Sequence, residues 1–78
     1  MRQLLSVILH RQDDTLLRLT GLCYRRGVPI ESLAFSAADQ PGRVRVQAVL
    51  SCEQSVALQL QRHVSKLIDV VSTEIVSN

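Results

Sequence analysis

The sequence predicts an α+β fold in which four strands and two helices follow one another in the order β-α-β-β-α-β. Four segments of strand length either alternate apolar with polar residues or are apolar throughout, and two others carry apolar residues at helical spacing. Gly27 with Pro29, and Pro41 with Gly42, are stop signals that separate these segments. At 78 residues, we expect a single domain over residues 1–78.

The first strand is predicted over residues 4–10, where apolar residues on both faces are typical of a central strand. In the polar run that follows, Asp13 or Asp14 can cap a helix, which we expect to begin at about Asp14. Its apolar face continues to Arg26, and Gly27 suits the left-handed residue that ends a helix. The residues of this apolar face are Leu16, Leu19, Leu22 and Cys23.

The second half begins with a strand over residues 30–37 and a turn over residues 40–43, which has proline second and glycine third. Alternation over residues 43–50 predicts a half-buried strand that forms a hairpin with the strand before it. Ser51 and Gln54 fit a capping box for a second helix. The predicted apolar face of that helix is Val56, Ala57, Leu60, Val64 and Leu67, and residues 68–76 form the last strand.

This order of elements predicts the ferredoxin-like architecture. Right-handed crossovers in the two strand-helix-strand halves place both helices on one face of a four-stranded antiparallel sheet. The first and third strands are then central. The strand over residues 30–37 lies at an edge, where its unpaired backbone groups are available to a partner.

Composition excludes several functions. Aromatic residues make up 3% of the chain and the arginines are scattered at a net charge of +2, so we expect no nucleic-acid binding. The apolar run over residues 4–9 is too short for a signal peptide or a membrane span. Cys23 and Cys52, each on a predicted helix, are interpreted as reduced thiols of a cytoplasmic protein, with Cys23 buried.

No catalytic or metal site is predicted. His10 and His63 are far apart in the chain, and Asp13 with Asp14 fits a helix cap better than a metal site. The first loop, residues 11–15, lacks the paired cysteines of soft-metal carriers and the glycine with which acylphosphatase-type enzymes hold phosphate. A small enzyme of that type is therefore disfavoured, and a non-catalytic binding or regulatory module remains.

Several segments carry a family resemblance. The chain resembles the ACT domain of the small, regulatory subunit of acetohydroxyacid synthase (acetolactate synthase), in the short form that lacks an additional C-terminal domain. The most specific match is Arg26-Gly27 followed by Ile30-Glu31-Ser32-Leu33. Other matching residues are 5–9, Leu16, Gly21, Leu22, Arg25, Pro41 and 66–70.

The resemblance implies partners and a role. Small subunits of this family bind and activate a large catalytic subunit, which holds thiamine diphosphate, Mg and FAD, while the small subunit itself binds no cofactor. Many confer feedback inhibition by valine or a related branched-chain amino acid. Such domains form homodimers through the edge strand, which places Glu31, Leu33 and Phe35 near the seam. Ordinary packing within the domain is an equally open interpretation of Leu33 and Phe35.

The resemblance also implies an effector site between two protomers. It lies between the first loop of one protomer, here residues 11–16, and the strand entry of its partner, which is residues 28–30. Three positions depart from the family: Arg11 and Pro29 replace asparagines, and Asp14 replaces a glycine. Because Asp14 would repel the carboxylate of an amino acid, we expect valine feedback to be weak or absent. The implied site residues are Arg11, Gln12, Asp13, Asp14, Thr15, Leu16, Val28, Pro29 and Ile30.

The sequence therefore leaves two functions open. The first is a non-catalytic small subunit that regulates an acetolactate synthase in branched-chain amino acid biosynthesis. The alternative is a free-standing ACT module that senses an amino acid. Binding to a large catalytic subunit distinguishes the first from the second.

Overall fold

The computed structural model describes residues 2–10, 15–67 and 70–77. Within them the predicted order of elements is confirmed. The elements are β1 (Arg2–His10), α1 (Thr15–Arg25), β2 (Ile30–Ala37), β3 (Arg43–Ser51), α2 (Gln54–Val64) and β4 (Val70–Ser77).

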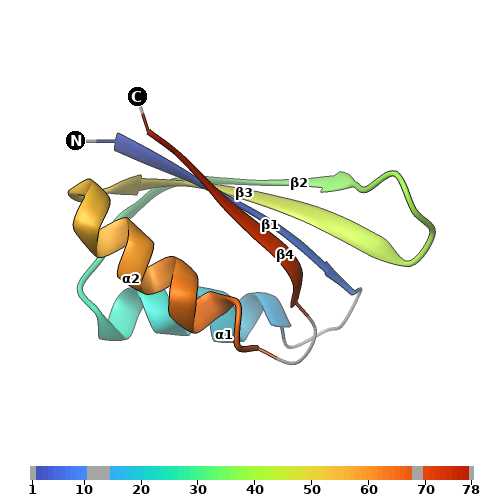
Figure 1. The fold of residues 1–78 in the computed structure, drawn as a ribbon, viewed down its shortest axis with the longest axis horizontal. Coiled ribbons are helices and arrows are strands. Elements are labelled where there is room, and N and C mark those ends of the chain that lie inside the picture. The colour runs from blue at the N-terminus through green and yellow to red at the C-terminus, as the bar shows by residue number, and fades with distance from the viewer. Residues whose placement is uncertain (1, 11–14, 68–69, 78) are drawn as a thin grey trace.

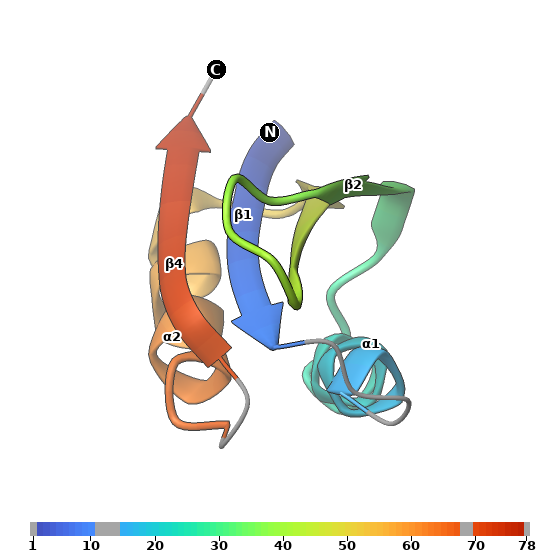
Figure 2. The same ribbon diagram turned by 90° about the vertical axis from the view of Figure 1, so that its right-hand side faces the viewer.

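The four strands form one antiparallel sheet in the order β2-β3-β1-β4. Both helices lie on the same side of it (Figure 1). Figure 2 shows α2 beneath β1 and β4, and α1 on the side of β2. The ferredoxin-like prediction is confirmed, with β1 and β3 central and β2 at one edge of the sheet.

The core lies between the sheet and the helices. Every second residue of β1 and β3 faces it, and the strand register places these residues opposite one another, as with Leu5 and Ala48 or Val7 and Val46. Leu4 and Ile8, on the other face of β1, are half-buried. The buried apolar residues are Leu5, Val7, Leu9, Leu19, Cys23, Val28, Val46, Ala48, Leu50, Ala57, Leu60 and Val64.

The end of α1 is fixed by Gly27, which has a positive φ of 68°. The Val28 N–H donates to the Cys23 carbonyl at 2.9 Å, and the Gly27 N–H donates to the Tyr24 carbonyl at 3.0 Å. This pair of bonds satisfies carbonyl groups that the last helical turn leaves free and turns the chain toward β2. The predicted glycine stop is confirmed.

Two glycine substitutions are expected to have opposite effects on stability. A methyl group at Gly27 meets no atom within 4 Å, so Gly27→Ala acts through its left-handed backbone alone and should destabilise the chain by about 1 kcal/mol. Gly21, inside α1, also has open space around it, and Gly21→Ala should stabilise by about 0.5–1 kcal/mol. Urea unfolding of both variants measures the difference, and equal midpoints would contradict it.

The β2–β3 turn follows the sequence. Gly42 has a φ of 77° in the third position, and the Arg43 N–H donates to the Gln40 carbonyl at 3.3 Å. The Ala38 N–H in turn donates to the Arg43 carbonyl at 3.2 Å, which closes the hairpin. The predicted turn and hairpin are confirmed.

The predicted capping box is wrong. Ser51 is the last residue of β3, because it pairs with Arg2 and its N–H donates to the Pro29 carbonyl at 3.0 Å. The residue that caps α2 is Glu53, whose side chain makes no capping hydrogen bond. Cys52 consequently lies between β3 and α2 rather than on a helix.

The predicted starts of the first helix and of the last strand lie outside the described residues. The helix cap assigned to Asp13 or Asp14 lies outside them, and α1 begins at Thr15. The last strand starts at Val70 within the described part of the chain. It is tied to α2 by a hydrogen bond of 3.1 Å from Gln61 Nε2 to Thr73 Oγ1.

Candidate functional site

The strand entry, residues 28–30, is only partly exposed to solvent. The Val28 side chain is buried in the core, and Ile30 is half-buried against it. Pro29 is exposed, and its carbonyl is held by the Ser51 N–H. Of the three predicted effector residues of this segment, Pro29 is therefore the one whose side chain a ligand can reach.

The first loop is largely outside the described residues. Arg11, Gln12, Asp13 and Asp14 all fall there. Thr15 and Leu16 form the first turn of α1, which starts at the end of the sheet where β1 finishes.

Within one chain, the described part of the first predicted segment and the strand entry lie at opposite ends of the sheet. Ile30 pairs with Leu50, which pairs with Gln3 near the start of β1. His10, which precedes the first loop, pairs with Arg43 at the start of β3. One protomer alone therefore does not bring the described residues of the two segments together.

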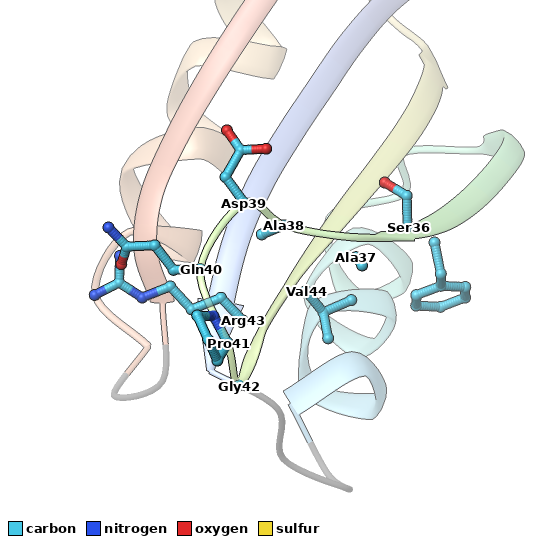
Figure 3. A pocket seen from close by; sticks show the side chains of 10 residues that line it. Ser36, Ala37, Ala38, Asp39, Gln40, Pro41, Gly42, Arg43 and Val44 are labelled. Carbon is cyan, nitrogen blue, oxygen red and sulfur yellow. The ribbon is translucent and has the colours of Figure 1, made fainter.

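A hollow lies inside the β2–β3 hairpin, at the same end of the sheet as His10. Figure 3 shows Gln40 and Arg43 pointing to the same side of its turn. Sequence analysis placed the turn but did not single out a hollow, since the depth of a hairpin depends on how the strands twist. The lining residues are Phe35, Ser36, Ala37, Ala38, Asp39, Gln40, Pro41, Gly42, Arg43 and Val44.

The predicted seam residues differ in their surroundings. Leu33 pairs with Ala48 and packs against the core, which is the ordinary packing that the sequence left open. Phe35 lies on the same face of β2 but is 52% exposed. The Glu31 carboxylate is an ion-pair partner of Arg2, with 3.3 Å between Oε2 and Nε. Phe35 is thus the seam residue with apolar surface left to bury.

His63 has a specific neighbour that sequence analysis missed. Its Nε2 lies 2.6 Å from Nη2 of Arg26, so the guanidinium donates and the imidazole accepts. Desolvation lowers the pKa of His63, and the charges of Arg26 and Lys66 lower it further. These effects favour the neutral imidazole that the contact requires. The signal in the sequence is weak, because Arg26 and His63 are 37 residues apart.

The cysteines are both free thiols, as predicted. Cys23 is buried, and burial raises its pKa, so the neutral and unreactive form is favoured. Burial also raises the pKa of Cys52. Within the described residues no group of three or more His, Cys, Asp and Glu side chains could hold a metal ion.

None of the helices in the described part of the chain is both long and apolar enough to cross a membrane.

The fold is that of a ferredoxin-like domain with a free edge strand, β2. Comparison with known families shows which such domain it is. The ACT domain model matches residues 11–73. The chain belongs to the ACT domain family.

Within that family the chain is similar to small subunits of acetolactate synthase. It is 35% identical to the isozyme 3 small subunit of Escherichia coli over 91% of this chain and 44% of the relative. It is 37% identical to the small subunit of Mycobacterium avium over 86% of this chain and 40% of the relative. The chain thus spans less than half the length of these relatives.

Solved structures show the same fold. The small subunit of acetolactate synthase from Thermotoga maritima superposes with a TM-score of 0.88 at 22% identity, over 99% of this chain and 48% of that one. The ACT domain of GTP pyrophosphokinase from Chlorobium tepidum has a TM-score of 0.80 at 13% identity, over 97% of both chains.

Proposed function

We propose that this chain is a non-catalytic small subunit that regulates an acetolactate synthase in branched-chain amino acid biosynthesis. The observation that carries the proposal is the similarity to such small subunits over 91% of the chain. In this role residues 1–78 form a single ACT domain in the cytoplasm. Thiamine diphosphate, Mg and FAD belong to the large catalytic subunit, which the chain activates by contact.

The proposed subunit is a homodimer joined through β2. The Ala38 N–H points to β3, and backbone direction alternates along a strand, so the N–H groups of Leu33, Phe35 and Ala37 point away from the sheet. An antiparallel copy of β2 can pair with these groups. On α1, which lies on the side of β2 (Figure 2), Leu17 and Tyr24 are 73% and 86% exposed and offer further apolar surface.

The dimer would assemble the effector site that one chain leaves divided. Antiparallel pairing of β2 with its copy brings the strand entry of one protomer to the other protomer's His10 end, beside the first loop. Pro29 is the exposed residue of that entry, and its side chain has no hydrogen-bonding group. The family resemblance implies in addition that Asp14 stands where a glycine usually meets the effector carboxylate, so we propose that valine is bound weakly or not at all.

Reconstitution tests the function. The chain is mixed with a large catalytic subunit of acetolactate synthase from the same organism, and acetolactate formation is measured with and without valine, leucine and isoleucine. We expect complex formation and a rise in activity. A chain that neither binds nor activates the subunit would refute the proposal. Amino-acid binding without such a partner would favour the free-standing sensor.

Calorimetry tests the feedback hypothesis separately. Titration of the chain with valine at millimolar concentration is expected to give no saturable heat. The repulsion between the Asp14 carboxylate and that of valine should exceed the free energy gained from contacts of the small valine side chain. Saturable binding that Arg11→Ala removes would contradict this, since Arg11 would then be compensating for Asp14.

A further inference from the structure

A groove between α1 and α2 carries cationic side chains on an apolar floor. Leu22 and Val56 line it from the two helices, and Gln59 adds a polar group. Arg25 and Arg26 line it at the end of α1. Because both helices lie on the same side of the sheet (Figure 1), the groove between them faces away from the open side.

The positive charge of this groove is not neutralised within the described residues. No described carboxylate lies within ion-pair distance of Arg25 or Arg26. Arg25 Nε donates instead to the Gly21 carbonyl of its own helix at 3.4 Å, and Arg26 contacts the neutral ring of His63. Lys66 lies close enough to act on His63 electrostatically.

The existing contacts explain part of this arrangement. A cation in the last turn of α1 interacts favourably with the helix dipole, worth about 0.3–1 kcal/mol at an exposed site. That accounts for one arginine near a helix end. It does not account for a guanidinium held against an imidazole, with a lysine beside them and an apolar floor between the helices.

Charge and shape together indicate the occupant. A free anion gains from the cations but not from Leu22 and Val56, whereas a protein segment with acidic and apolar side chains gains from both. We propose that the groove lined by Leu22, Arg25, Arg26, Val56 and Gln59 docks an acidic segment of the large catalytic subunit. This inference rests on the proposed function. The edge of β2 remains free for the second copy.

Binding measurements with charge-reversed variants test the inference. The dissociation constant for the large catalytic subunit is expected to rise at least tenfold in the double variant Arg25→Glu and Arg26→Glu. Arg43→Glu, at the β2–β3 hairpin, is the matched control and should change it less than twofold. The milder pair Arg25→Gln and Arg26→Gln, checked by circular dichroism, separates loss of charge from loss of folding.

Two further readouts identify the contact directly. Lys66 is the only lysine of the chain, so zero-length carbodiimide coupling should join it to Asp or Glu of the catalytic subunit. By NMR the pKa of His63 should rise in the complex, because carboxylates oppose the effect of Arg26 and Lys66. His10, at the end of β1, is the internal control.

The outcomes separate the two proposals. A wild-type chain that does not bind the catalytic subunit overturns both. Normal binding by both double variants, with His63 unchanged in the complex, overturns the docking groove alone. Saturable titration of His63 by inorganic phosphate, with no effect of the double variants on binding to the catalytic subunit, assigns the groove to a small anion and also overturns it.

Discussion

Phe35→Glu is expected to convert the proposed dimer into a monomer. In the proposed dimer the exposed half of the Phe35 ring is buried in both protomers, and two glutamates there would lose that burial and repel one another. Together these effects amount to about 3 kcal/mol or more, which raises the dissociation constant more than hundredfold. Sedimentation equilibrium measures the change.

The control for this variant is Leu58→Glu. Leu58 is 41% exposed and lies on α2, where Leu58→Glu introduces the same charge away from β2. It should leave the dimer intact. A monomer in both variants, or a dimer in both, would contradict the seam at β2.

Leu60→Ala is expected to lower the free energy of unfolding more than Gly27→Ala or Leu58→Ala. Leu60 is fully buried in the core, and such a truncation costs about 2–5 kcal/mol through lost burial and the cavity that remains. A domain of this size has little stability in excess, so the melting temperature should fall by about 10 °C or more.

The comparison for Leu60→Ala is Leu58→Ala on the same helix. Because Leu58 is partly exposed, its truncation should change the free energy of unfolding by less than about 1 kcal/mol. Both variants are compared at one protein concentration, since the proposed dimerisation would add to apparent stability. Equal effects would show that α2 does not pack through Leu60.

Local signals explain what the sequence could predict. Gly27 ends α1 and Gly42 completes the hairpin turn because each position needs a positive φ, and glycine marks such positions. A run of apolar and small residues located β2, and alternation located β3, to within a residue of their ends. These features depend on residues that are close together in the chain, so the sequence alone is enough to predict them.

Features that depend on distant residues were missed. Ser51 could cap a helix by its type, but the Pro29 carbonyl and the Arg2 partner hold it in β3. The contact of Arg26 with His63 needs two helix ends to meet, which spacing does not reveal. Leu33 and Phe35 share a face of β2, yet Leu33 packs against the core and Phe35 is 52% exposed, a difference that alternation along the strand does not reveal.

The pairing of Gln3 with Ser77 has a consequence for how larger assemblies can be built. Both chain ends leave the sheet at the end opposite the hairpin (Figure 1). In an antiparallel dimer, each end of the joint sheet therefore carries the termini of one protomer and the hairpin of the other. A fluorophore or fused domain attached at a terminus would lie at the same end of the joint sheet as the partner's Gly42 turn, with β3 and β2 of its own protomer between them.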